Sequence, residues 1–251
     1  MDTATSNAVS VTAGARTYGS YTQIDAATAH EYDAFYLLAW EAGTAGLVGT
    51  VAIGGSGSEV AIATDIPLHM PSTRRQLTSV YLPVNVPAGS RLSVKLSRDT
   101  GTSGTATVGI LGIQGGVGFP VGFQRATGYG LTASFGYSTA TASASANTLG
   151  SYGQITASTA NNMKALTFAL HSTSSTTSTN LLNLAVGGAG SETVILANVP
   201  LYIYASTAQT NVVSYGPLPC NIPSGTRLAA NLQSSVGSTA INARVAVIGF
   251  D

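Results

Sequence analysis

Charged side chains are scarce in this sequence: aspartate, glutamate, lysine and arginine together make up 8% of its 251 residues. Ten acidic and ten basic residues balance to a formal net charge of zero. The basic residues are scattered, and Arg74 and Arg75 form the only adjacent pair. A protein that holds phosphate backbones or anionic lipids needs a concentrated positive patch. The composition therefore argues against nucleic-acid and membrane-surface partners.

Cysteine is nearly absent as well, since Cys220 is the only one. One cysteine allows no intrachain disulfide, which excludes the class of small disulfide-stapled secreted domains. The first residues lack the basic segment and the apolar stretch of a signal peptide. No run of about 18 apolar residues occurs either, so we expect no transmembrane helix. The hydrophobic fraction of 44% nevertheless favours a packed protein over a disordered one.

What the sequence does contain is a long internal repeat. The peptide AIGGSGSEVAI, residues 52–62, returns as AVGGAGSETVI at residues 185–195. In the same order, YGSYTQIDAAT returns as LGSYGQITAST and LPVNVPAGSRL returns as LPCNIPSGTRL. The offset grows from 131 to 136 residues along these matches, as expected if loops of the second copy gained residues. We therefore predict a first domain at 1–114, a glycine-rich linker at 115–131 and a second domain at 132–251.

The hydrophobic pattern within each copy is typical of β-strands. LSVKLSRD from Leu92 and ARVAVIGF from Ala243 alternate apolar and polar residues, and proline and glycine separate the short runs. AHEYDAFYLLAWEA in the first copy has helix propensity. Its counterpart ANNMKALTFALHST alternates at Leu166, Phe168 and Leu170, so we interpret both as strands that follow a polar turn. We expect an all-β chain of two tandem, internally homologous β-sandwich domains of jelly-roll type.

Two pairs of charged residues recur in the repeat. Glu59 and Glu192 hold the same place in the two copies, and so do Arg91 and Arg227. We predict a bidentate glutamate–arginine pair that stabilises each domain, with a functional carboxylate–guanidinium partnership as the alternative. The neighbouring Gly-Gly-x-Gly-Ser-Glu segment predicts a tight hairpin turn, because glycine adopts positive φ freely. It lacks the Gly-Lys-Ser/Thr ending of a phosphate-binding loop.

No set of catalytic, cofactor-binding or metal-binding residues emerges. HEYD, residues 30–33, is an acid–base cluster that the second copy replaces with NNMK, so we interpret it as a solvated loop. Cys220 aligns with Val84, which predicts a buried, inert thiol. No histidine pair has metal-ligand spacing, and no G-x-S-x-G elbow occurs. Catalytic carboxylate pairs stay open for the whole chain, although the second copy holds only Glu192 and Asp251 as acids. We predict a protein that is not an enzyme and has no cofactor.

Aromatic residues are the best candidates for an interaction surface. Trp40 is the only tryptophan, and Phe119 and Phe123 make the linker too apolar for a freely solvated tether. We therefore expect the linker to pack against a domain or a neighbouring chain. Aromatic rings on a sandwich usually belong to the core, but a group of them can also stack on sugars. The residues that could join Trp40 in such a group are Tyr18, Tyr21, Tyr32 and Tyr36.

The motifs IGGSGSEVAI followed by LPVNVPAGSRLSVKL, and VGGAGSETVI followed by LPCNIPSGTRLAANL, resemble structural proteins of tailed bacteriophages. The resemblance covers both copies. It implies jelly-roll or β-sandwich modules of the kind found in capsid cement or decoration proteins and in tail or fibre components. It also implies a major capsid protein or tail proteins as partners, self-association into a homo-oligomer such as a trimer, and a place in a virion assembled in the host cytoplasm.

Three functions remain open at this point. The first is a non-enzymatic structural protein of a phage virion that decorates or cements the capsid through its β-sandwich surfaces. The second is a tail fibre or baseplate component that binds a host receptor. The third, of another class, is a carbohydrate-binding β-sandwich module or a β-sandwich hydrolase.

Overall fold

The computed structural model describes residues 9–41, 46–69, 77–115, 122–132, 134, 137–172, 176–203, 213–238 and 241–251. Within these residues every regular element is a β-strand, as the alternating pattern predicts. The described part of the chain holds no helix with the length and apolar character needed to span a membrane. The all-β prediction is therefore confirmed.

In the ranges just given, each copy contributes eight strands, and one further strand lies between the copies. The strands of the first copy are β1 (Val9–Ala15), β2 (Thr22–Asp25), β3 (Ala34–Glu41), β4 (Leu47–Ile53), β5 (Val60–His69), β6 (Leu77–Leu82), β7 (Leu92–Arg98) and β8 (Gly104–Ile113). The intervening strand is β9 (Ala126–Tyr129). The strands of the second copy are β10 (Ser138–Thr141), β11 (Gly153–Thr156), β12 (Met163–Ser172), β13 (Ser178–Val186), β14 (Thr193–Ile203), β15 (Val213–Ile222), β16 (Leu228–Ser234) and β17 (Asn242–Phe250).

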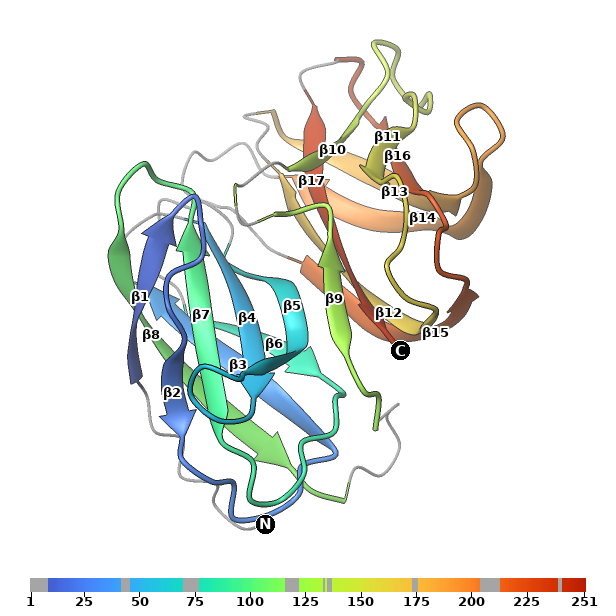
Figure 1. Cartoon of the computed structure of the whole chain (residues 1–251). Helices are drawn as coiled ribbons and strands as arrows, with labels where there is room; N and C mark the ends of the chain where they lie inside the picture. The colour runs from blue at the N-terminus through green and yellow to red at the C-terminus, as the bar shows by residue number, and fades with distance from the viewer. Residues whose placement is uncertain are drawn as a thin grey trace. The chain divides into compact units, whose positions relative to one another are not determined.

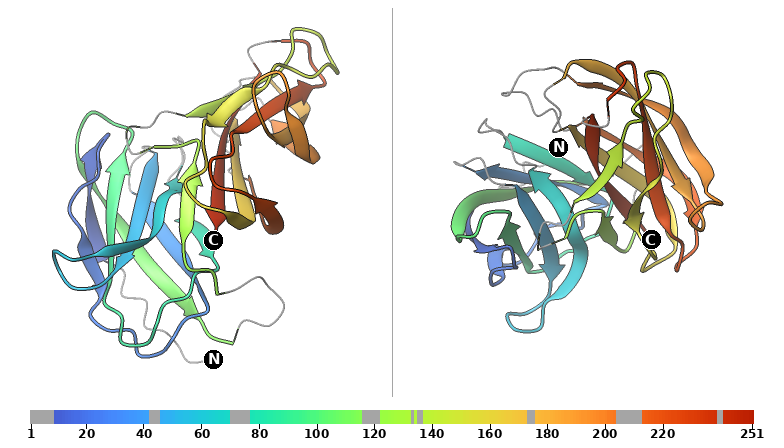
Figure 2. Two further views of the ribbon diagram at one scale, coloured as in Figure 1. Left: turned by 45° about the vertical axis from the view of Figure 1, so that its right-hand side comes forward. Right: turned by 90° about the horizontal axis from the view of Figure 1, so that it is seen from above.

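The two copies share one strand order. In the first copy the sheets run β6-β3-β8-β1 and β2-β7-β4-β5, and in the second they run β15-β12-β17-β10 and β11-β16-β13-β14 (Figures 1 and 2). If the eight strands of each copy are numbered 1 to 8 along the chain, the two sheets of both copies have the strand orders 6-3-8-1 and 2-7-4-5. Consecutive strands thus cross repeatedly between two facing sheets, which is the jelly-roll arrangement of eight strands. The predicted tandem of jelly-roll-like sandwiches is confirmed.

Strand β1 joins the two sheets of the first copy along one side. Its first part pairs antiparallel with β8, from Val9 to Ala13. Its last part pairs parallel with β7, where Ala13 lies opposite Leu96. The second copy has the same link in shorter form, because Ala142 just after β10 forms a parallel bridge with Leu232 of β16. This side of each sandwich is therefore closed by backbone pairing.

Small and aliphatic side chains fill the space between the sheets. In the first copy Phe35, Leu37 and Leu47 are fully buried, and in the second copy Phe168 and Leu232 are. The core of the second copy collects residues from all eight of its strands, so the two sheets face each other across it. β3 is the segment with helix propensity, and β12 is its counterpart. Both are strands because one face of each packs into the core of its own copy.

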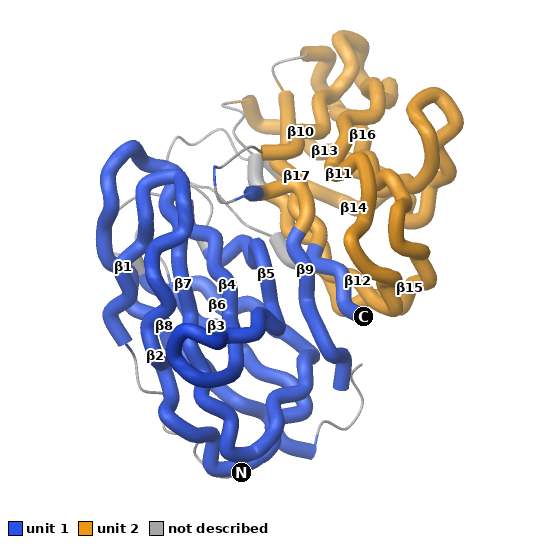
Figure 3. The backbone as a smooth tube through the Cα atoms, viewed as in Figure 1, with its two compact units in different colours: residues 1–128, 132–135, 248–251 blue, residues 129–131, 136–247 orange. Residues whose placement is uncertain are grey.

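The chain divides into two compact units (Figure 3). The first contains residues 1–128, 132–135 and 248–251, and the second contains residues 129–131 and 136–247. The division predicted from the repeat, at residues 114 and 132, stays a prediction. Part of the linker packs in the first unit, where β9 pairs parallel with β5 and Phe123 stacks on Phe250 with 5.7 Å between ring centroids, whereas residues 129–131 belong to the second unit.

Candidate binding surface

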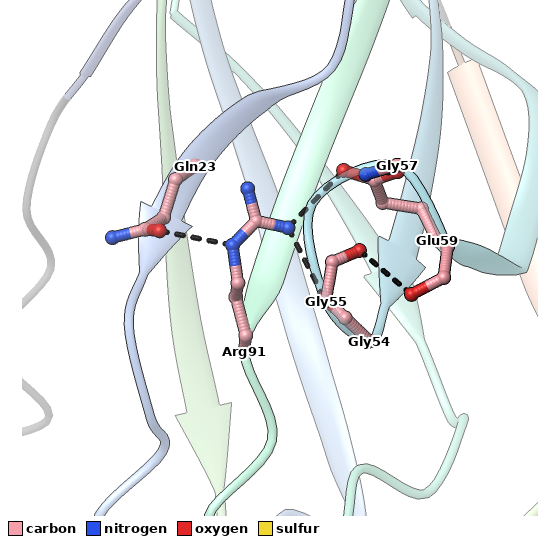
Figure 4. A network of polar contacts seen from close by, with 7 residues as sticks. Gln23, Gly54, Gly55, Gly57, Glu59 and Arg91 are labelled. Atoms are coloured by element: carbon pink, nitrogen blue, oxygen red, sulfur yellow. Dashed lines mark hydrogen bonds and ion pairs between the residues drawn. The ribbon is translucent and has the colours of Figure 1, made fainter.

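The repeated glycine peptide is a hairpin turn held by an arginine. In the first copy the turn joins β4 to β5, and Gly54 and Gly57 adopt positive φ of 111° and 83°. The Nη1 of Arg91 donates to the carbonyl oxygen of Gly54 at 3.1 Å and to Oε1 of Glu59 at 3.2 Å (Figure 4). The Nε of Arg91 donates to Oε1 of Gln23 in β2 at 2.9 Å. One guanidinium therefore connects the turn, the start of β7 and the edge strand β2.

The second copy repeats this clamp contact for contact. The Nη1 of Arg227 donates to the carbonyl oxygen of Gly187 and to Oε1 of Glu192, both at 3.0 Å. Its Nε donates to Oε1 of Gln154 in β11 at 3.3 Å. The backbone N–H of Gly190 donates to Oε2 of Glu192 at 2.9 Å, as Gly57 does to Glu59. The conserved spacing of these residues within the chain is thus explained by one shared hydrogen-bond network.

The clamp keeps its carboxylates charged. Hydrogen bonds from the backbone of Glu59 itself, from Arg91 and from Gly57 hold the pKa of Glu59 below its ordinary value, against the opposing effect of burial. Burial also opposes the charge on Glu192, yet hydrogen bonds from its own backbone and from Arg227 outweigh it and lower the pKa. The glutamate side chains are 9% and 8% exposed. These pairs are structural ties and leave little surface for a ligand.

One detail of the predicted pairing differs in the structure. The sequence predicted two parallel bonds between guanidinium and carboxylate. Instead Oε1 of each glutamate meets Nη1 of the arginine, while Oε2 accepts the N–H of the glycine in the turn. The turn places that N–H two residues before the glutamate, so the carboxylate is shared between turn and arginine. The arginine in return turns its Nε toward a glutamine of the edge strand.

The acid–base cluster at His30 to Asp33 is used locally. Oε1 of Glu31 accepts the side-chain N–H of Asn85 at 2.8 Å, and Oδ2 of Asp33 accepts the backbone N–H of Gly115 at 2.6 Å. Tyr32 is buried against Gly112, where any Cβ would collide with its ring. Among the described residues no group of three or more His, Cys, Asp or Glu is placed to hold a metal ion.

The aromatic residues that the sequence groups with Trp40 lie in three different places. Tyr18 and Tyr21 flank Lys95 of β7, whose Nζ lies 4.8 Å and 4.7 Å from their ring centroids. The hydroxyl of Tyr18 also donates to Oδ1 of Asp65 at 2.5 Å. The ammonium group covers these rings through cation–π contacts, so they are poor partners for a stacked ligand.

The second copy has different residues at the position that the Lys95 cluster occupies in the first copy. Repeat counterparts of Thr50, Lys95 and Asp65 are Asn183, Asn231 and Asn198. The side-chain N–H of Asn183 donates to Oδ1 of Asn231 at 3.1 Å, and its Oδ1 accepts the N–H of Asn198 at 2.8 Å. A neutral amide network thus replaces the charged cluster of the first copy.

Of the two phenylalanines of the linker, the structure describes only Phe123, and its contacts lie elsewhere than at Trp40. Phe123 packs on Phe250 and forms a parallel bridge with Val84. Phe119 lies outside the described residues, so its proposed contribution to an interaction surface stays a prediction.

Trp40 belongs to an exposed face on the first copy. In β3 the residues Phe35, Leu37 and Ala39 are buried in the core, so Tyr36 and Trp40 point to the opposite side of the sheet. Trp40 is 42% exposed. Its side chain is therefore available on the outer face of the sheet β6-β3-β8-β1.

Neighbouring strands extend this face with further aromatic and aliphatic residues. Tyr36 lies opposite Tyr81 of β6, and their ring centroids are 5.2 Å apart at a 54° tilt. Burial, the nearby Tyr36 and the carboxylate of Asp33 raise the pKa of Tyr81. Trp40 lies opposite Leu77, which is 60% exposed. We call this surface the aromatic face; it consists of Tyr36, Leu38, Trp40, Leu77, Tyr81 and Leu111.

Hydroxyl groups and a gap complete the aromatic face. Ser79 lies opposite Leu38, and Thr107 lies opposite Trp40. Gly109 also lies opposite Leu38, and a Cβ built there would meet no atom within 4 Å. Open space thus interrupts the side-chain layer beside Leu38. None of these outward residues carries a formal charge.

The aromatic face is a feature of the first copy. Leu82 and Leu218 are counterparts in the repeat. Phe35 of β3 lies opposite Leu82, and Leu166 of β12 lies opposite Leu218, so β3 aligns with β12 at an offset of 131 residues. At that offset Tyr36 and Leu38 correspond to Thr167 and Ala169, which are 5% and 6% exposed. Sequence reasoning identified Trp40 but missed Leu77, Tyr81 and Leu111, although the alternation in LTSVYL marks two of them as one side of a strand.

Comparisons with known proteins identify no family for this chain. No family model matches the sequence, and no curated protein matches it. Among solved structures, the chain is similar to the N-terminal CBM22-1–CBM22-2 tandem domain of Xyn10C from Paenibacillus barcinonensis, with 11% identity over 92% of this chain and 82% of that one and a TM-score of 0.31. Function is therefore argued from the residues of this chain alone.

The clamp predicts a pH-dependent stability difference. A lowered carboxylate pKa contributes stability above the unfolded-state pKa of about 4.3, and this contribution is lost as the pH falls toward the folded-state pKa. At pH 7, replacing Glu59→Gln and Glu192→Gln together should lower Tm by about 2–8 °C, the shift that losing roughly one hydrogen bond gives in domains of this size. The difference in Tm between the variant and the wild type should disappear as the pH falls below about 4.

Thermal scans by circular dichroism between pH 7 and pH 3 measure this gap, with Glu31→Gln on the exposed loop as the control. A gap that stays constant over this range would show that the clamp carboxylates contribute nothing through their charge.

Cys220 is expected to be unreactive in the folded protein. Cys220 is half-buried, whereas its counterpart Val84 is fully buried, so the predicted burial of the thiol is met only in part. Its Sγ lies 3.5 Å from the carbonyl oxygen of Met163, and burial raises the pKa of the thiol to about 11. At pH 8 the native protein should react with a disulfide reagent roughly a hundred-fold more slowly than the urea-unfolded chain, because so little thiolate is present. Absorbance of the released thiolate follows the reaction, and equal rates in both states would contradict the buried-thiol interpretation. Cys220→Val, matching Val84, should retain the native Tm.

Proposed function

We propose that this protein is a non-catalytic binding protein whose first copy holds uncharged sugar rings on the aromatic face. The observation that carries the proposal is the exposure of Trp40 on the same face of the sheet as the tilted pair of Tyr36 and Tyr81. Large aromatic rings left at the surface on a shared face are unusual for a monomeric soluble domain, and such patches mark interaction sites.

The chemistry of the aromatic face fits a neutral glycan. One side of a pyranose ring presents C–H groups that pack on the electron-rich face of an aromatic ring. Its hydroxyl groups need hydrogen-bond partners at the rim, and Ser79 and Thr107 lie there. No charged side chain occupies the outward positions of this face, which favours uncharged sugars over acidic ones.

A second candidate function is that of a structural component of a phage particle. The motifs that resemble phage structural proteins favour it, and the structure shows what those motifs do: Glu59, Arg91 and their counterparts form the clamp. A shared clamp supports a shared domain type more than a shared position on a particle. The two candidates are compatible, because a tail component that recognises a host glycan would satisfy both. The capsid or tail partners and the homo-oligomer, such as a trimer, belong to this second proposal.

The glycan proposal predicts a direct fluorescence signal, because Trp40 is the only tryptophan. Binding of a neutral oligosaccharide should shift the fluorescence emission of Trp40 to shorter wavelength, since stacking removes water from the indole. Trp40→Ala should weaken binding at least about ten-fold, the loss typical of a hot-spot aromatic residue. A glycan array followed by calorimetry measures the affinity of wild type and variant.

The matched control is Tyr202→Ala, which removes an aromatic ring that is 58% exposed on the second copy. It should bind like the wild type. If Trp40→Ala binds glycans as well as the wild type, or if no neutral glycan binds at all, the aromatic face is not a sugar site.

The particle proposal predicts that two linked jelly-roll sandwiches appear in a cryo-EM map of the virion. Many copies on the shell lattice would establish capsid decoration, and density only at the tail would establish a tail component. Absence from the purified particle, measured by mass spectrometry of its proteins, would reject a structural role there.

A further inference from the structure

The two copies differ in how the last strand of one sheet is covered. β5 and β14 are the same strand of the jelly roll, and each ends the sheet with strand order 2-7-4-5. In the first copy β9 pairs in parallel with the outer edge of β5, with Ala63 opposite Ala126 and Thr64 opposite Thr127. Among the described residues no strand or bridge pairs with the outer edge of β14, which runs from Thr193 to Ile203.

Side-chain burial follows the same difference. Ile62, Ala63 and Pro67 of β5 are buried. Their counterparts in β14 are more exposed: Ile195 and Leu196 are half-buried and Pro200 is exposed. Natural proteins normally pair, cover or charge the edge of a sheet, because its free N–H and C=O groups attract another strand. The eleven residues of β14 carry no charge, so nothing electrostatic protects this edge.

The covered edge shows what a covering strand requires. Asp65 in β5 has a positive φ of 54°, and Asn198 at the same place in β14 has 56°, so both strands share a local distortion. Gly128 of β9 passes this point so closely that a Cβ on it would collide with the carbonyl oxygen of Asp65. A strand that lies along this edge therefore needs glycine just after its paired residues.

We propose that the outer edge of β14 is a strand-addition site for an extended, uncharged segment of a partner protein with the pattern of β9, small residue–threonine–glycine. In such recognition the backbone hydrogen bonds supply affinity and the side-chain requirements supply specificity. The occupant is inferred from the chain itself, since a segment of this chemistry already occupies the identical edge of the first copy. This site is independent of the aromatic face.

A peptide that copies the chain's own covering strand tests the proposal. The probe is ATGYGL, residues 126–131, with a fluorescent label, and the matched control peptide carries Gly128→Val. Fluorescence anisotropy with the full-length protein should show saturable binding of the probe. The valine peptide should bind at least about ten-fold more weakly, because its side chain would meet the backbone at Asn198.

Hydrogen exchange then locates the bound peptide. Addition of the probe should slow exchange in residues 193–203 and leave residues 60–69 unchanged. Equal binding of both peptides, no binding of either, or protection of residues 60–69 in place of 193–203 would overturn the proposal. So would a stable dimer in light scattering whose β14 is protected without peptide, because a second copy would then occupy the edge.

Discussion

The contact on which each domain most depends is one guanidinium shared by three parts of the chain. Arg91 sits at the start of β7 and bonds to the β4–β5 turn at Gly54 and Glu59 and to Gln23 in β2. It thereby spans the sheet β2-β7-β4-β5 from one edge strand to the turn that precedes the other. Half-buried charges are stable only when hydrogen-bonded, and here each partner satisfies the other. The same network in the second copy explains why its residues recur while most of the chain has diverged.

A shared frame leaves the outward positions free to differ. The register imposed by the clamp directs Lys95 outward between two tyrosines in the first copy, whereas Asn231 joins an amide network in the second. On the other sheet, the outward residues Tyr36 and Leu38 of β3 correspond to Thr167 and Ala169 in β12, which are buried. The two copies are therefore scaffolds of one topology whose surfaces differ: the first carries the aromatic face, and in the second no described strand pairs with the outer edge of β14.

Scarce charge ties these features together. Two glutamates and two arginines are largely buried inside the clamps, and the outward positions of the aromatic face hold aromatic rings, aliphatic groups and hydroxyl groups. This also clarifies the resemblance to phage structural proteins. Its motifs contain the clamp residues, whose role is to stabilise the domain, so they carry information about the fold. The outward residues of β3, β6 and β8 lie outside those motifs, which overlap β14 only at residues 193–195.

Local patterns in the sequence determined the strands, the tandem repeat, the hairpin turn and the association of Glu59 with Arg91. Each follows from short-range alternation, from glycine at a sharp turn, or from comparing one copy with the other. Tertiary structure alone decided that Tyr36 and Trp40 share a face with Leu77, Tyr81 and Leu111 while Tyr18 and Tyr21 do not. It also decided that β9 covers the edge of β5, whereas no strand within the described part of the chain covers that of β14. The reason is that a strand's own sequence tells which residues alternate, but its neighbours are set by pairing with segments far away along the chain.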